Sequence, residues 1–202
     1  GEDIVLNRLV NMSSGGFYVD IGAHHPFRFS NTFLLYKNGW SGLVLDASEN
    51  TIKMFKRWRP RDICLNVGVG QRKEKLDYFE FEDSALNTFD RELADQYVNL
   101  HKHPIVSKKK IKLTTLSDIF SKYANGKQID ILNIDIEGFD LKALRSNNWR
   151  LFRPKIIIDE CLKSKSIKDT FEDPIVLYLE KKSYMPVSRL VNSIIFEDMG
   201  KH

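Results

Sequence analysis

The chain has 202 residues, 42% of them apolar and 29% charged, which excludes a disordered protein and fits one globular domain. Its net charge of +4 is too small to indicate nucleic-acid binding by itself. No apolar run is long enough to cross a bilayer, and the charged start of the chain is not a signal peptide. Cys64 and Cys161 both lie in apolar stretches typical of strands. We therefore expect buried thiols, no disulfide and a cytoplasmic protein.

Strand and helix patterns alternate along the first part of the chain. Short apolar stretches that end at turn signals predict three buried parallel strands, at residues 17–23, 41–48 and 61–70. A helix is expected over residues 31–38, with Ser30 as its N-cap. A second helix is expected to begin after Ser48, its N-cap, and to run to Pro60.

The rest of the chain continues this alternation after a less regular middle. Strands are predicted at residues 75–83, 109–116, 129–138, 154–160, 184–190 and 193–198. Helices are predicted at residues 91–100, 117–123, 139–148 and 175–183, the last one starting at the Asp173-Pro174 pair. This order predicts a doubly wound α/β sheet of seven strands, one of them antiparallel. We expect a single domain over residues 1–202, either a whole protein or a domain excised from a longer one.

Acidic and amide residues end the predicted core strands, where doubly wound sheets bind their ligands. These residues are Asp20, Asp46, Asn66, Asp135, Glu137, Asp159 and Glu160. A glycine turn after the first strand, followed by an acid that ends the second strand, is typical of a site for a ribose-containing cofactor. Gly22 would let the backbone pass close to the ligand, and Asp46 would accept hydrogen bonds from both ribose hydroxyls.

The same turn disfavours a dinucleotide. Ala23 and His24 stand where a G-x-G-x-x-G motif has further glycines, and the sequence contains no P-loop motif. Asp20 would repel a pyrophosphate, but it suits the ammonium group of an amino-acid-bearing cofactor, directly or through water. Its simpler role would be to cap the following turn. An acid for the ribose together with an acid for an ammonium group describes S-adenosylmethionine.

Residues 16–160 resemble the FkbM-type S-adenosylmethionine-dependent methyltransferases. The most specific matches are D-x-G-A-x-x-P from Asp20, S-N-T from Ser30 and D-I-E-G-F-D from Asp135. The resemblance implies a Rossmann-like class I methyltransferase fold, with the last strand antiparallel, and O-methylation of sugars or natural products. It implies cofactor contacts for Asp20, Gly22, Ala23, Ser30, Asn31 and Thr32 at the methionine end, Asp46 at the ribose, Ala47, Asn66 and Val67 at the adenine, and Asp135, Ile136 and Glu137 beside the reacting methyl group.

Methyl transfer to an alcohol requires in-line geometry and removal of the hydroxyl proton. The predicted catalytic residues are Asp135, Glu137, Glu160 and His24. Carboxylates packed together raise one another's pKa, which suits one of them for the role of base. Alternatively, Asp135, Asp159 and Glu160 bind Mg²⁺, which would polarise the acceptor hydroxyl. The simpler roles are that Glu137 caps the next helix or pairs with a lysine, and that Asp159 only ends its strand.

The expected acceptor is a sugar hydroxyl of a glycan or glycosylated product, with a deoxyhexose such as rhamnose taken from family habits. The expected product is S-adenosylhomocysteine. Phe27 and Phe29 are expected to line the acceptor site, and the His24-His25-Pro26 stretch departs from the commoner family pattern. Rival functions are an RNA or natural-product methyltransferase and a non-catalytic nucleotide-binding module. Nucleic acid is disfavoured because no basic and aromatic residues interleave.

Overall fold

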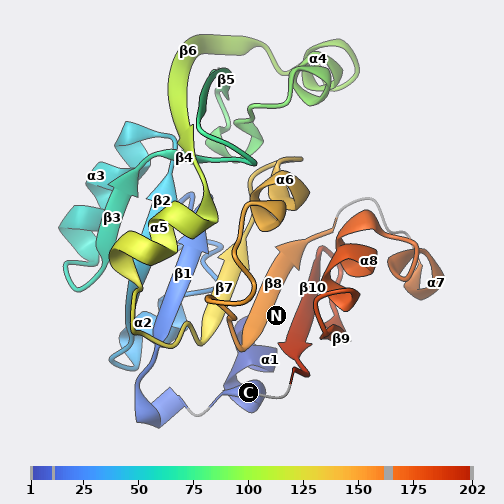
Figure 1. Cartoon of the computed structure of the whole chain (residues 1–202). Helices are drawn as coiled ribbons and strands as arrows, with labels where there is room; N and C mark the ends of the chain where they lie inside the picture. The colour runs from blue at the N-terminus through green and yellow to red at the C-terminus, as the bar shows by residue number, and fades with distance from the viewer. Residues whose placement is uncertain (1, 11, 162–165, 201–202) are drawn as a thin grey trace.

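A computed structural model describes residues 2–10, 12–161 and 166–200. Seven strands form the main sheet, in the order β3-β2-β1-β7-β8-β10-β9 (Figure 1). They are β1 (Phe17–Ile21), β2 (Ser41–Asp46), β3 (Ile63–Asn66), β7 (Ile131–Ile134), β8 (Ile156–Glu160), β9 (Tyr184–Arg189) and β10 (Ser193–Asp198). Strands β3, β2, β1, β7 and β8 run parallel to one another, and β10 is antiparallel to both of its neighbours, β8 and β9. The predicted Rossmann-like sheet with an antiparallel last strand is confirmed.

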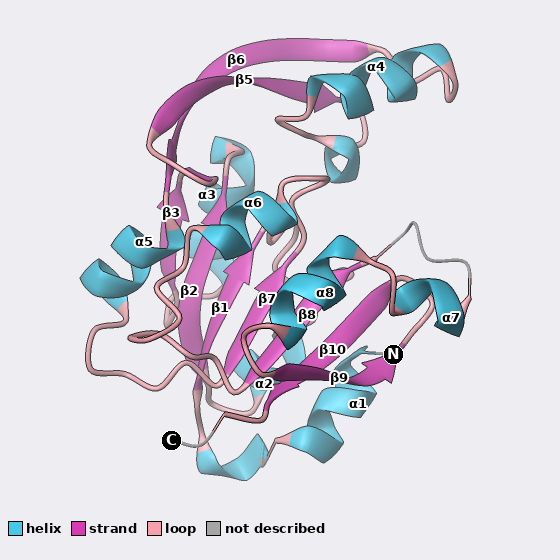
Figure 2. Ribbon diagram, turned by 45° about the vertical axis from the view of Figure 1, so that its right-hand side comes forward, coloured by secondary structure: helices cyan, strands magenta, loops and turns pink. Residues whose placement is uncertain are grey.

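Helices cover both faces of this sheet (Figure 2), because alternate residues of each strand pack on opposite sides. Tyr18 packs in one cluster with Leu35 of α2 (Phe33–Lys37), and Val19 packs in the other with Phe120 of α5 (Leu116–Tyr123). The first face also carries α1 (Glu2–Leu9) and α3 (Glu49–Trp58), and the second carries α6 (Asp140–Arg145) and α8 (Pro174–Glu180). Three short elements lie outside these helices and strands: α7 (Ile167–Thr170) and the 3₁₀ turns η1 (Met12–Ser14) and η2 (Ser84–Leu86).

A second, three-stranded sheet stands above the carboxyl ends of the main strands (Figure 1). It consists of β4 (Gly68–Val69), β5 (Glu74–Phe81) and β6 (Ile105–Thr114). Helix α4 (Arg91–Asn99) connects β5 to β6 and lies beside the end of this sheet (Figure 1). The prediction of one strand over residues 61–70 is therefore wrong. Its first part pairs with β2 only as far as Asp46, whereas Gly68 and Val69 pair with β6. The chain leaves the main sheet after Asn66, because β2 ends at Asp46 and offers no further residue for pairing.

The predicted helix caps are confirmed in two cases and wrong in one. The Ser48 hydroxyl accepts the Thr51 N–H at 3.4 Å, and Asp173 caps α8 by accepting the Ile175 N–H at 2.8 Å. Ser30 does not cap α2, which begins at Phe33. Its hydroxyl instead accepts a hydrogen bond from Arg59 at 3.3 Å, since a buried guanidinium needs oxygen partners.

The prediction that both cysteines are buried is confirmed for one of them. Cys161 is buried as expected, whereas Cys64 is only half-buried. Among the described residues, no helix combines the length and apolar character that a membrane crossing requires.

Gly22 lies where two loops of the main sheet meet. It has a φ of +76°, and its N–H donates to the Leu45 carbonyl at 2.9 Å. A Cβ atom at this position would lie 1.7 Å from the carbonyl oxygen of Asp135. The sequence suggested that a bound ligand requires this glycine. The structure shows another cause, which is that the turn after β1 crosses the backbone after β7 with no room for a side chain.

We predict that Gly22→Ala lowers the free energy of unfolding by more than about 4 kcal/mol, or prevents folding, because the methyl group would clash with backbone. Gly126→Ala is the matched control. Gly126 has a similar φ of +73° but nothing within 4 Å of the added Cβ, so only the backbone strain of about 1–2 kcal/mol is expected. Urea denaturation measures both, and equal effects would show that the crossing tolerates a side chain.

Candidate active site

A cavity of about 820 Å³ lies at the carboxyl ends of β1, β2, β7 and β8, and residues of β4 and β5 in the second sheet also line it. This volume is in the range of pockets that hold cofactors and small molecules. All the predicted cofactor-binding and catalytic residues line it except Asn66 and Thr32. Asn66 instead supports the backbone of two lining residues, since its amide donates to the carbonyls of Asp46 and Ala47 at 3.0 and 2.9 Å. Thr32, which the family resemblance placed near the methionine end, also lies outside the lining.

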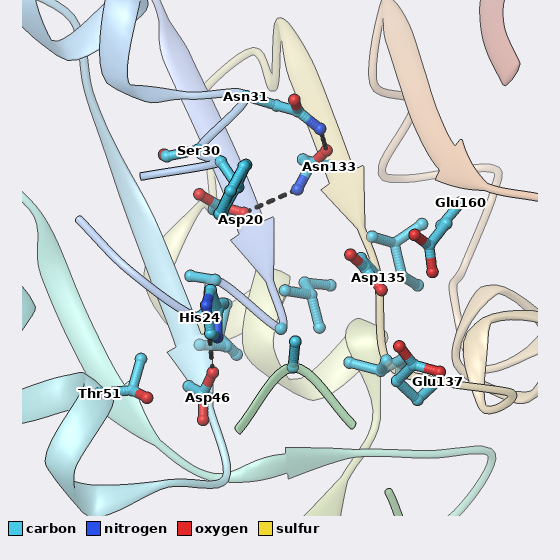
Figure 3. A pocket seen from close by; sticks show the side chains of 18 of the residues that line it. Asp20, His24, Ser30, Asn31, Asp46, Thr51, Asn133, Asp135, Glu137 and Glu160 are labelled. Atoms are coloured by element: carbon cyan, nitrogen blue, oxygen red, sulfur yellow. Dashed lines mark hydrogen bonds between the residues drawn. The ribbon is translucent and has the colours of Figure 1, made fainter. Parts of the chain in front are cut away.

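Asp46 ends β2 with its carboxylate against the first turn (Figure 3). One oxygen accepts the Ser48 N–H at 2.6 Å, and the other accepts the His24 N–H at 3.2 Å. Burial raises the pKa of Asp46 to about 6, although both backbone hydrogen bonds lower it. Each oxygen keeps a further lone pair that could accept a hydroxyl. The group therefore suits a diol once it is ionised.

Asp20 is a buried carboxylate in the middle of the sheet, with only 2% of its surface exposed. It accepts the Thr32 hydroxyl at 2.5 Å. It also accepts the Asn133 amide at 2.8 Å (Figure 3). Asn133 faces Asp20 in register on β7, and its own oxygen accepts the Asn31 amide at 2.9 Å. Burial raises the pKa of Asp20, and the positive charge of Arg59 opposes that shift. The sequence signal for Asn133 was a polar residue inside an apolar strand.

Arg59 is fully buried and was not identified from the sequence. It follows α3, and its guanidinium forms an ion pair with Asp62 at 2.7 Å. It also donates to the hydroxyls of Tyr18 at 2.7 Å and Thr32 at 3.0 Å. An arginine near a helix end is usually exposed, so its type and position alone gave no reason to place it beneath the cavity.

Three carboxylates, Asp135, Glu137 and Glu160, meet at the ends of β7 and β8 (Figure 3). An oxygen of each lies within 4.8 Å of the others. Burial raises the pKa of Asp135 and of Glu160, and the neighbouring carboxylates raise both further. A side-chain hydrogen bond joins Asp135 to Glu160. The raised pKa values and the hydrogen bond fit a pair of carboxyl groups that holds one proton between its two members.

The predicted magnesium set of Asp135, Asp159 and Glu160 is not assembled. Consecutive residues of a strand point to opposite faces, so Asp159 lies on the other side of β8 from Glu160. It is buried there, and its Oδ1 atom makes no hydrogen bond among the described residues. Glu137 takes its place in the cluster.

Glu137 is held by the segment that includes the second sheet. Its φ is +47°, a strained value for a residue other than glycine. Thr88 donates to its carbonyl and Tyr97 of α4 donates to its carboxylate, both at 2.8 Å. The alternative that Glu137 caps the next helix is wrong. The N-cap of α6 is Phe139, without a side-chain cap hydrogen bond, and Asp140 accepts the N–H groups of Ile136 and Gly138 in the turn before the helix.

The histidines have separate environments. His24 lines the cavity at a φ of +49°, with its Nδ1 atom 3.4 Å from the Ser84 hydroxyl. His25 is turned to its own loop, where its Nδ1 atom accepts the N–H groups of Phe27 and Arg28 at 3.1 Å. Phe27 and Phe29 both line the cavity, and Phe29 is 90% exposed.

We predict that Tyr97→Phe lowers the free energy of unfolding by about 1 kcal/mol, because it leaves the Glu137 carboxylate without its donor while keeping the ring. Tyr123→Phe is the matched control, since the Tyr123 hydroxyl makes no hydrogen bond among the described residues. We expect that control to be neutral in urea denaturation. A neutral Tyr97→Phe would contradict a role for this hydroxyl in holding Glu137.

The family model for the methyltransferase FkbM domain matches residues 20–185. No curated protein matches the chain. The match begins at Asp20 and includes Asp46 and all three clustered carboxylates, so it covers the strand ends that bring acids to the cavity. Methyltransferases of this kind usually take their methyl group from S-adenosylmethionine. With the seven-stranded sheet and a match over most of its length, the chain belongs to the FkbM methyltransferase family.

Proposed function

We propose that the protein is an O-methyltransferase that transfers a methyl group from S-adenosylmethionine to a sugar hydroxyl of a glycan or glycosylated product, such as a deoxyhexose. The observation that carries this proposal is the convergence of Asp20, Asp46 and Asp135 on one cavity, from three neighbouring strands. Such a site offers one acid to a diol, one to an amino group and one to a reacting centre.

The residues present fit the cofactor. Asp46 would accept the ribose hydroxyls, and Asp20 would face the amino group, directly or through water. Ala47, Val67 and Phe89 form an apolar part of the lining that suits an adenine ring. This arrangement directs the methionine end toward Asp135 and Glu160. When bound, S-adenosylmethionine supplies an electrophilic methyl group.

The acid pair would perform the proton transfer. A sugar hydroxyl is a very weak acid, so it needs a base as the methyl group is transferred. Asp135 and Glu160 share one proton, and the ionised member of the pair would take the hydroxyl proton. Glu137, fixed by Tyr97, would hold the pair and orient the acceptor. His24, across the cavity, is a second candidate for contact with the acceptor.

The lining beyond the acid pair supports a sugar as acceptor. Asn31, Asn192 and Ser193 line the cavity with hydrogen-bonding groups, and Phe27 and Phe29 add aromatic surface. Sugars combine hydroxyl groups with C–H faces, and this mixture of side chains suits both. Mg²⁺ is an alternative aid to the same reaction. The oxygens of Asp135, Glu137 and Glu160 would hold it, and it would stabilise the ionised acceptor hydroxyl.

We predict that S-adenosylhomocysteine binds the wild-type protein, with an affinity that falls about tenfold for each pH unit below about pH 6. Only ionised Asp46 can accept both ribose hydroxyls, and its pKa is about 6. Isothermal titration calorimetry between about pH 5 and pH 8 measures this. Asp46→Asn should bind weakly and lose most of the pH dependence. Equal affinities for wild type and variant at high pH would rule out this role for Asp46.

We predict that Asp135→Asn and Glu160→Gln each lower kcat for methyl transfer by at least about 100-fold, because they remove the base but not the cofactor site. The assay follows labelled methyl groups from S-adenosylmethionine into a panel of deoxyhexose glycosides. Binding of S-adenosylhomocysteine should persist in both variants. Asp159→Asn, on the opposite face of β8, is the matched control and should retain most of its activity.

Two outcomes would revise this chemistry. Full activity in Asp135→Asn would show that the base lies elsewhere, with His24 the next candidate. Activity that is unchanged by EDTA would remove the Mg²⁺ alternative and leave the acid pair as the base.

A further inference from the structure

The loop between β1 and α2 forms one wall of the cavity and is anchored from behind by Arg59. Residues 27–31 of this loop all line the cavity. Arg59 lies on the other side of the wall and donates to three of the loop's oxygens. These are the Pro26 carbonyl at 3.5 Å, the Ser30 hydroxyl at 3.3 Å and the Thr32 hydroxyl at 3.0 Å. The position of the wall therefore depends on one buried guanidinium.

Thr32 connects that guanidinium to Asp20 in a fixed direction. An arginine can only donate hydrogen bonds, so the Thr32 hydroxyl accepts from Arg59. The single hydroxyl proton of Thr32 is then left for Asp20, at an oxygen–oxygen distance of 2.5 Å. Asn133 donates to the other oxygen of Asp20 at 2.8 Å. Both oxygens of Asp20 are thus fixed by donors, and its plane cannot rotate freely.

The same chain of contacts brings a positive charge near Asp20. A carboxylate that is buried without compensation is strongly disfavoured. Asp62 forms the direct ion pair with Arg59, and Asp20 is a second anion near the same guanidinium, reached through Thr32. Tyr18 closes the arrangement by accepting from Arg59 and donating to Asp62 at 2.5 Å. Burial and Asp62 raise the pKa of Asp20, whereas Arg59 and the hydrogen bonds from Thr32 and Asn133 favour its ionised form.

We propose that Thr32 and Arg59 are positioning residues for the amino-acid end of the cofactor, because they hold both oxygens of Asp20 in one orientation toward an incoming ammonium group. This inference rests on the proposed function, in which the cavity binds S-adenosylmethionine. Neither residue needs to touch the ligand, and Thr32 does not line the cavity. Their contribution to affinity therefore concerns only the amino-acid end of the ligand.

Two ligands that differ in that part make the test selective. S-adenosylhomocysteine carries the amino-acid group, and 5′-methylthioadenosine has the same adenosine and thioether without it. Thr32→Val removes the hydroxyl at nearly constant volume and should weaken binding of S-adenosylhomocysteine about tenfold or more. Its affinity for 5′-methylthioadenosine should stay within about twofold of wild type. Calorimetry on the folded variants measures both.

Two matched variants serve as controls. Thr32→Ser keeps the hydroxyl and should restore the affinity for S-adenosylhomocysteine. Thr51 is another buried threonine, which does line the cavity but lies on α3 beside Asp46, outside the chain from Arg59 to Asp20. Thr51→Val should change the affinities for the two ligands by the same factor. If Thr32→Val does not fold, the smaller Thr32→Ala repeats the test without added bulk.

The outcomes separate this inference from the proposed function. Equal losses for both ligands in Thr32→Val would reduce Thr32 to a structural role and overturn the inference, as would an unchanged affinity for S-adenosylhomocysteine. In either case wild-type binding would leave the proposed function standing. A wild-type protein that binds neither ligand would overturn the proposed function and this inference with it.

Discussion

Asp20 is an acid buried at the centre of a parallel sheet, and much of the surrounding structure exists to compensate it. Arg59, which reaches it through Thr32, offsets part of its charge, and its second oxygen is fixed by Asn133. Because the same guanidinium also binds Pro26 and Ser30, the compensation of one carboxylate sets the position of the cavity wall. A buried charge of this kind costs stability, which is consistent with a functional role for Asp20.

A second constraint joins the two halves of the site. The turn after β1 crosses the backbone after β7 so closely that only glycine fits at position 22. The Asp135 N–H donates to the Ile21 carbonyl at 3.0 Å, which fixes the turn against the acid cluster. The segment with the second sheet then adds Tyr97 to hold Glu137 from above. Three parts of the chain thus place the carboxylates around one cavity.

The residues at the strand ends could be predicted because local pattern determines them. An apolar run that stops at an acid marks the edge of a parallel sheet, and this located Asp20, Asp46, Asp135 and Glu160. Contacts that depend on the packing of distant segments could not be predicted. Arg59 comes from the end of a helix and Tyr97 from the segment with the second sheet. Nothing in the residues next to them indicates which side chains they contact. The position of Asp159 at a strand end predicts a place in the cluster, but its side chain points to the opposite face of β8. The local pattern at Ser30 predicts a helix cap, but the hydroxyl meets Arg59, which the local sequence does not indicate.

A crystal structure of the protein with S-adenosylhomocysteine most directly tests whether Asp46 and Asp20 hold the two ends of one ligand. We expect both ribose hydroxyls within about 3.2 Å of the Asp46 carboxylate. We also expect the amino group near Asp20, in direct contact or through one water, with the sulfur facing Asp135 and Glu160. A ligand bound with its ribose away from Asp46, or a cavity that stays empty at saturating ligand, would contradict this assignment.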